Sequence, residues 1–333
     1  MLGLVFKKRR QRDALRQEVG LLQAALLPSV PPGLPASVAH RAAEGATAGG
    51  DFYDAFPLAD GRVGLILGDV SGHGSDALAR TTFVRYTLRA YLEAGLEPRH
   101  VLKVGSDALA AHLDGGFAMV AVAVHDVASG RFTYACAGHP PPVVVGGSGR
   151  FDPVVACSAP PLGIGEPTGF RQSTFTLTAG ARACFYTDGV SEARVEGESL
   201  GADWLEEALT ALPPDADADT LLAAVTAMAD EITDEMAVCL VAATDGAPLA
   251  GPRIEELEVV DEHEVGDSLE RFLRACAVPL AEVPGVLRAA GEEARREGSV
   301  IVRVRADGVR PGVDVVPGHV VRLPERRRAA RIG

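Results

Sequence analysis

The chain has 333 residues, which is enough for about two domains of ordinary size. Apolar residues make up 47% of it and charged residues 23%, as is usual for a soluble globular protein. The formal net charge is −13, and so acidic a chain is a poor partner for nucleic acid, whose phosphates repel it.

The cysteines and the N-terminus indicate the cellular compartment. Five cysteines are widely spaced, lie mostly in apolar runs and form no Cys-x-x-Cys pair, so we expect reduced thiols rather than disulfides or a zinc site. The apolar start at residues 1–6 is too short to span a bilayer, and the basic run at 7–10 follows it instead of preceding it as in a signal peptide. We therefore predict a cytoplasmic protein without a transmembrane segment.

Residues 11–27 are predicted to form a helix. Pro28 ends the pattern, and a helix of this kind can pack along a domain edge. Its apolar stripe consists of Leu15, Val19, Leu22, Ala25 and Leu26.

Between about residues 51 and 232, the sequence predicts pairs of strands separated by pairs of helices. A turn at 59–62 joins two strands, and helices are expected at 76–91 and 98–112. Strands at 117–124 and 131–137 are joined by a hairpin, and two helical patterns between 199 and 232 flank a polar run. This order predicts antiparallel sheets with helices outside them.

A linker at 244–252 precedes a second pattern. Beyond it we expect a strand at 254–260, helices at 267–277 and 284–297, a strand at 299–305 and a basic tail at 326–328. This C-terminal module, residues 246–333, is therefore predicted to be a small α+β unit.

Acidic residues stand at the ends of apolar runs. An Asp-Gly pair alone is more often a turn than a ligand, but a carboxylate at the tip of a buried strand is costly to desolvate without a cation or hydrogen-bond donors. Four such acids in succession predict a metal site. They are Asp51 in Gly-Gly-Asp-Phe-Tyr-Asp (49–54), Asp69 after the run 64–68, Asp188 after 183–187, and Asp234 before 236–241.

Five motifs in order give the chain a family resemblance. It resembles the metal-dependent (PPM-type) Ser/Thr protein phosphatases, in their bacterial SpoIIE-like branch, over about residues 26–243. The motifs are Gly-Gly-Asp-Phe-Tyr-Asp (49–54), Gly-Asp-Val-Ser-Gly-His-Gly (68–74), Ala-Gly-His-Pro-Pro-Pro (137–142), Tyr-Thr-Asp-Gly-Val-Ser-Glu (186–192) and Asp-Glu-Met (234–236).

The resemblance implies a fold and a division of the chain. We expect an α+β protein with a four-layer α/β/β/α sandwich at residues 31–245, preceded by a linker helix at 1–30 and followed by the C-terminal module. The linker helix at this position in the family can form a homodimer. The module faintly resembles the ATP-binding domain of anti-sigma-factor kinases, and Glu293 stands where those domains have an acidic residue in a helix. The Asn that follows that acid in the kinases and their Gly-rich lid are both missing from this sequence. The alternative is that the module is a structural appendage.

The resemblance also assigns ligands. Asp69 would bridge two Mn²⁺ or Mg²⁺ ions and the carbonyl of Val70 would bind one of them, while Asp51 joins the second ion and Asp188 and Asp234 the first. An all-oxygen site of this kind suits hard divalent cations. The motif at Asp234 departs from the family at Glu235 and Ala237, and Asp230 offers a competing match.

Other residues have supporting roles in this interpretation. His73 is either a general acid for the leaving Ser or Thr oxygen or a loop residue that shapes the turn. Asp54 would support the first loop or a bound water, Gly189 would support the Asp-Gly turn, and His139 would hydrogen-bond within the fold.

The function expected from the resemblance is removal of phosphate from phosphoserine or phosphothreonine. The implied substrate is a small regulatory protein in sigma-factor control, a STAS-type anti-sigma-factor antagonist. Two alternatives remain open, a phosphatase fold that has lost turnover and holds a partner, and an anti-sigma-like binding role for the C-terminal module.

Overall fold

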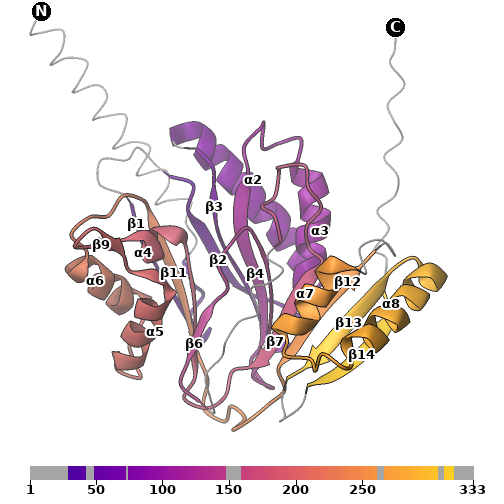
Figure 1. Cartoon of the computed structure of the whole chain (residues 1–333). Helices are drawn as coiled ribbons and strands as arrows, with labels where there is room; N and C mark the ends of the chain where they lie inside the picture. The colour runs from indigo at the N-terminus through magenta and orange to yellow at the C-terminus, as the bar shows by residue number, and fades with distance from the viewer. Residues whose placement is uncertain are drawn as a thin grey trace, which may run out of the picture.

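The computed structural model describes residues 29–42, 49–72, 74–147, 159–260, 266–306 and 311–318. Figure 1 gives the arrangement of the chain. The expected N-terminal helix at 11–27, the basic tail and His73 lie outside the described residues.

Two antiparallel sheets form the centre of the molecule (Figure 1). One has four strands in the order β1 (Ala36–Arg41), β11 (Met236–Ala242), β8 (Arg182–Tyr186) and β6 (Val143–Val145). The other has eight, in the order β14 (Gly312–Pro317), β13 (Val300–Arg305), β12 (Ile254–Val259), β7 (Arg171–Thr176), β5 (Arg131–Ala137), β4 (Ala118–Asp126), β3 (Arg62–Val70) and β2 (Phe52–Pro57). A small separate pair joins β9 (Arg194–Val195) to β10 (Glu198–Ser199).

Helices cover the outer faces of the two sheets. On the eight-stranded sheet, α2 (Gly74–Glu93) and α3 (Pro98–Leu109) bury their leucines and valines against β3, β4 and β5. On the four-stranded sheet, α5 (Gly201–Ala211) and α6 (Ala218–Met228) do the same. The layers are therefore α/β/β/α, and the predicted fold class is confirmed.

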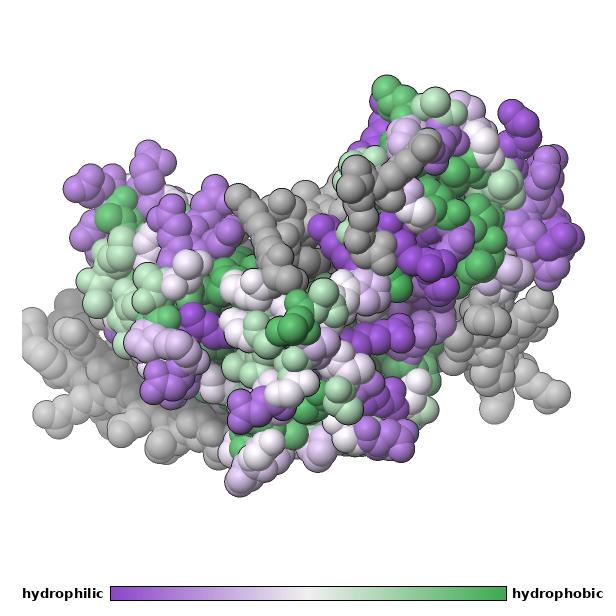
Figure 2. All heavy atoms as spheres, turned by 90° about the horizontal axis from the view of Figure 1, so that it is seen from below, coloured by the Kyte–Doolittle hydropathy of each residue, from purple (hydrophilic) through white to green (hydrophobic). Residues whose placement is uncertain are grey.

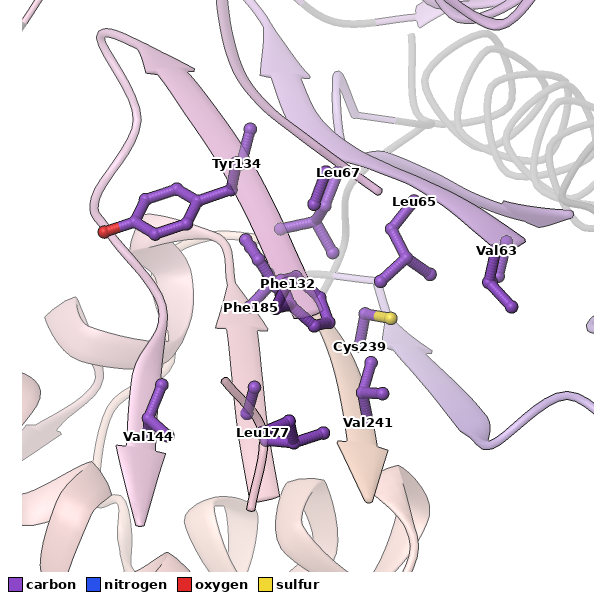
Figure 3. Close-up of a cluster of buried hydrophobic side chains, with 14 of the residues drawn as sticks. Val63, Leu65, Leu67, Phe132, Tyr134, Val144, Leu177, Phe185, Cys239 and Val241 are labelled. Carbon is purple, nitrogen blue, oxygen red and sulfur yellow. The ribbon is translucent and has the colours of Figure 1, made fainter. Parts of the chain in front are cut away.

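Aromatic rings lie among aliphatic side chains in the space between the sheets (Figure 3). Phe132 of β5 stacks on Phe175 of β7 at 5.2 Å and on Phe185 of β8, in the opposite sheet, at 5.6 Å between ring centroids. Stacked rings at this separation add to the stability that burial alone provides. The rings thus hold the two sheets together.

Strand β3 is apolar over most of its length because it is buried on both faces. Val63, Leu65 and Leu67 face the other sheet, while Ile66 and Val70 face α2 and α3. A strand buried on both faces needs apolar residues at every position. Because side chains alternate along a strand, Asp69 follows Leu67 on the face between the sheets.

Several strands were not expected from the sequence, and β1, β7 and β14 are among them. Strand β1 pairs with β11, β14 pairs with β13, and β7 lies between β5 and β12. Strand β7 has the polar sequence RQSTFT, yet Gln172, Ser173 and Thr174 are buried. Gln172 and Ser173 donate to glutamates of β12, which is distant in the sequence, and Thr174 bonds to Thr133 of β5, so the hydrophobic pattern that marks a buried strand is missing.

The C-terminal module continues the eight-stranded sheet. Strand β12 pairs with β7, and α7 (Asp267–Ala275) and α8 (Val283–Glu297) pack on Leu257 and Val259 of β12 and on the valines of β13. The helices predicted at 267–277 and 284–297 are present. The division of the chain at residue 245 remains a prediction, since hydrogen bonds between β7 and β12 run across it.

Buried glutamates on β12 form hydrogen bonds across the junction between the C-terminal module and the rest of the chain. Glu258 accepts hydrogen bonds from Arg99 (2.8 Å) and Lys103 (3.1 Å) of α3. Glu255 accepts from Ser173 and Glu256 from Gln172, both on β7. A buried carboxylate is tolerated when donors and positive charges surround it, so the junction is specific to these partners.

None of the helices in the described part of the chain is long and apolar enough to cross a membrane. On the lower face of the molecule, hydrophilic residues lie between hydrophobic ones over most of the surface (Figure 2).

We predict that Glu258→Ala lowers the free energy of unfolding by about 3–5 kcal/mol, because the substitution leaves the buried Arg99 guanidinium without its carboxylate. Urea unfolding of the whole chain measures this. The matched control is Glu293→Ala, whose partner Arg296 is largely exposed and which should change stability little. Equal effects of the two substitutions would contradict the role of the junction.

We also predict that His125 makes the protein sensitive to acid. Its ring is buried beside Phe132, neither nitrogen has a hydrogen-bond partner among the described residues, and burial lowers its pKa from 6.5 to about 4. The unfolded chain binds this proton first, so stability is present above pH 6.5 and is lost as the pH falls towards 4.

Replacing the ring removes that effect. Relative to the native chain, His125→Phe should gain up to about 3 kcal/mol between pH 7.5 and pH 4, with most of the change below pH 6.5. Unfolding curves at several pH values measure the difference between the two proteins. A difference that does not change with pH would show that the ring titrates alike in the folded and unfolded chains.

Candidate functional site

The predicted acids meet at one edge of the space between the sheets. Asp51 precedes β2 and, by the register that pairs Phe52 with Gly68, comes opposite Asp69 near the end of β3. Asp188 begins the short helix α4 (Asp188–Glu192) directly after β8, and Asp234 stands just before β11, the neighbour of β8. The two pairs of acids therefore come from the two different sheets.

Electrostatic coupling shows that these acids form one group. Burial raises the pKa of Asp51, and the charges of Asp69, Glu235 and Asp188 raise it further, against a hydrogen bond from Thr187. Burial also raises the pKa of Asp69, to about 7, and Asp188, Asp234 and Glu235 add to the effect. The pKa of Asp188 is raised by burial and by Asp234. We call Asp51, Asp69, Asp188, Asp234 and Glu235 the acid cluster.

Glycines allow the chain to approach closely around the cluster. A Cβ at Gly50 would lie 1.9 Å from the Val70 carbonyl oxygen and 2.2 Å from Oδ1 of Asp69. A Cβ at Gly189 would lie 1.9 Å from the carbonyl oxygen of Glu235. Only a residue without a side chain fits at these two positions, so the Val70 carbonyl and Asp69 carboxylate lie together beside the first loop.

Glu235 is a member of the cluster that was not among the ligands predicted from the sequence, where it stood as a departure from the family. Its side chain is 2% exposed, and Oε2 lies 3.6 Å from Nε2 of His40 on β1. A Cβ at Gly49 would lie 2.2 Å from its carboxyl carbon, so this carboxylate also reaches the first loop. Its position next to Asp234, before an apolar strand, was the signal in the sequence.

Thr187 was not singled out from the sequence either. Its hydroxyl donates to Oδ2 of Asp51 at 2.7 Å and accepts from the backbone N–H of Ala237 at 2.8 Å. The residue is part of the Tyr-Thr-Asp-Gly motif, but nothing in the motif indicated that its partner is Asp51.

The remaining predicted residues lie in different places. Asp54 is buried on β2 under α2, where Arg89 donates to both of its oxygens at 3.3–3.4 Å, away from the cluster. His139 is buried and its Nδ1 contacts the carbonyl oxygen of Pro140 at 2.8 Å, while burial lowers its pKa to about 4, so it is neutral and bonded within the fold as expected. His73 falls outside the described residues.

The cluster suits a hard divalent cation by its chemistry. Carboxylate oxygens and one backbone carbonyl are the donors that Mg²⁺ and Mn²⁺ prefer, and bound positive charge would offset the burial and the repulsion that raise the pKa values of Asp51, Asp69 and Asp188. Within the described ranges, no three His, Cys, Asp or Glu side chains are already drawn together as a metal-binding group. The acids are thus near enough to repel one another, and a cation would have to draw them closer.

Comparison with known proteins defines the family. The sequence model of Stage II sporulation protein E (SpoIIE) matches residues 59–244, more than half of the chain, and the chain belongs to this family. Phosphoserine phosphatase RsbP of Bacillus subtilis is 31% identical over 43% of this chain and 36% of its own length. Phosphoserine phosphatase RsbU of the same organism is 26% identical over 45% of each. The chain thus spans less than half the length of these relatives.

Solved structures support the fold. The crystal structure of the RsbU and RsbW domains of Rv1364c from Mycobacterium tuberculosis is 26% identical, covers 84% of this chain and 81% of its own, and gives a TM-score of 0.52. The SiaA-PP2C domain of Pseudomonas aeruginosa covers 71% of this chain and 98% of its own, with a TM-score of 0.59 at 19% identity, which indicates the fold alone.

We predict that Gly50→Ala abolishes Mn²⁺ binding, because the added methyl group would force apart the Val70 carbonyl and the Asp69 carboxylate. Isothermal titration of the folded variant measures binding, and circular dichroism verifies the fold. The control is Gly285→Ala in α8, where a Cβ meets nothing within 4 Å and where alanine favours the helix. Native Mn²⁺ affinity in Gly50→Ala would contradict the proposed geometry.

Proposed function

We propose that the protein is a metal-dependent protein Ser/Thr phosphatase that acts on phosphoserine or phosphothreonine of a regulatory protein. The observation that carries the proposal is the acid cluster, a group of mutually coupled carboxylates at the edge between two sheets, in a chain of the SpoIIE family. RsbP and RsbU are both named phosphoserine phosphatases, which supports the same reaction class.

In this proposal the cluster holds two Mn²⁺ or Mg²⁺ ions. Asp69 would hold both ions and the Val70 carbonyl one of them, while Asp51 would hold the second and Asp188 and Asp234 the first. When bound, the ions lower the pKa of water and neutralise phosphoryl charge. The aspartates then fix where the phosphoryl group can lie, while Gly50 and Gly189 keep the chain close enough for them to do so.

Proton transfer to the leaving group is assigned to His73. The oxygen of a serine or threonine side chain is a poor leaving group, so an imidazole that donates a proton to it would accelerate the reaction. Asp54 has an indirect role, since its ion pair with Arg89 fixes β2, which leads out of the first loop, against α2. The implied substrate is a phosphorylated STAS-type anti-sigma-factor antagonist.

A second function for the C-terminal module has one observation in its favour. Residues 1–245 are less than three quarters of the chain, so the 84% match to the RsbU and RsbW domains extends into the module. We propose as the alternative that the module binds a partner protein, and that the phosphatase fold to which β12 joins it holds it in a fixed place.

Chelation tests the phosphatase. We predict that EDTA abolishes hydrolysis of an aryl phosphate and of a phosphoserine peptide, and that Mn²⁺ or Mg²⁺ restores it better than Zn²⁺ or Ca²⁺, because the donors are oxygens in a compact site. Asp69→Asn should be more damaging than Asp234→Asn, since Asp69 contacts both ions. Asp203→Asn, at an exposed position on α5, is the control. Turnover that survives exhaustive chelation would refute the proposal.

A further inference from the structure

Thr187 is buried at the point where the two sheets meet the acid cluster. It is the residue between β8 and α4, it is 1% exposed, and its backbone N–H donates to the carbonyl oxygen of Ala237 at 3.0 Å. The backbone around its side chain is therefore tied to β11. A hydroxyl on such a fixed backbone has few orientations open to it.

The direction of its hydrogen bonds follows from the donors present. The Ala237 N–H has a proton to give, and it donates to Oγ1 of Thr187 at 2.8 Å. The single hydroxyl proton then goes to Oδ2 of Asp51 at 2.7 Å or to the Ala237 carbonyl at 3.5 Å. The short bond to a carboxylate is much the stronger of the two. Oδ2 of Asp51 is thus held by a donor, and Oδ1 is the oxygen not engaged by this bond.

This bond joins two parts of the chain that are far apart in the sequence and lie at different sheets. Asp51 precedes β2, an end strand of the eight-stranded sheet, whereas Thr187 and Ala237 belong to the four-stranded sheet. Asp51 is 136 residues from Thr187 in the sequence. The orientation of the Asp51 carboxylate therefore depends on how the two sheets sit together at this edge.

We propose that Thr187 is a positioning residue, which holds the Asp51 carboxylate across the gap between the sheets in the orientation that binds a divalent cation. The inference rests on the proposed metal site. It assigns to the threonine of the Tyr-Thr-Asp-Gly stretch a task that is separate from that of Asp188 beside it. Groups that orient a ligand through a hydrogen bond commonly affect metal affinity by about 10- to 100-fold.

Three single variants test the proposal. Thr187→Val has almost the same shape and lacks the hydroxyl, and Thr187→Ser keeps the hydroxyl without the methyl group. Ser173→Ala is the matched control, because Ser173 is also a buried hydroxyl that donates to a buried carboxylate, that of Glu255, but at the β7–β12 junction. For each protein, calorimetry with Mn²⁺ gives the Kd, and thermal unfolding without metal gives the Tm.

Thr187→Val is expected to raise the Kd for Mn²⁺ by about 10- to 100-fold. Thr187→Ser should retain most of the native affinity for Mn²⁺. Ser173→Ala should lower the Tm without a change in the Kd for Mn²⁺. If Thr187→Val lowers the Tm as Ser173→Ala does and binds Mn²⁺ with native affinity, the threonine is merely structural and the proposal is wrong.

A double variant separates positioning from general loss of stability. If Thr187 acts through Asp51, then adding Thr187→Val to Asp51→Asn should change the Mn²⁺ affinity no further. Additive losses would overturn the proposal. Should Thr187→Val fail to fold, Thr187→Ala, which also lacks the hydroxyl, supplies the same comparison alone and combined with Asp51→Asn. A native protein that binds no Mn²⁺ would overturn the metal site itself, and this inference with it.

Discussion

Burial of several carboxylates at one edge of the molecule is the main physical constraint on this protein. In water such groups ionise freely near pH 4, but at the edge between the sheets burial and mutual repulsion raise the pKa values of Asp51, Asp69 and Asp188. Apolar contacts between the two sheets form a network that holds the chain together against this repulsion. The stacked rings of Phe132 and Phe185 and the apolar strand β3 provide that network between the sheets.

The protein treats buried carboxylates in two different ways. At the junction with the C-terminal module, Glu258 is surrounded by Arg99 and Lys103, so its charge is balanced within the chain. In the acid cluster several carboxylates raise one another's pKa, and the hydroxyl of Thr187 is a donor without charge. The first arrangement fixes structure, whereas the second leaves a local excess of negative charge, as a cation-binding site requires.

The junction also gives the C-terminal module a defined relation to the rest of the molecule. Because β12 continues the eight-stranded sheet from β7, the module is attached by a row of backbone hydrogen bonds as well as by ion pairs. Its helices α7 and α8 cover the face of β12 that bears Leu257 and Val259. A module attached in this way is held along a whole strand, and not merely at the end of a linker.

The residues of the chain predicted antiparallel sheets with helices outside them and acids at strand ends, because both have local signals, and the family resemblance added the four-layer order. An apolar run ending in Asp69 or Asp188 records burial and a polar tip within a few residues, and motifs identify Asp51. Thr187 became visible as Asp51's partner only in the tertiary structure, because that hydrogen bond joins residues 136 positions apart. Strand β7 was missed for the same reason, since its buried Gln172 and Ser173 hydrogen-bond to β12, far along the chain, and only folding brings the two strands together.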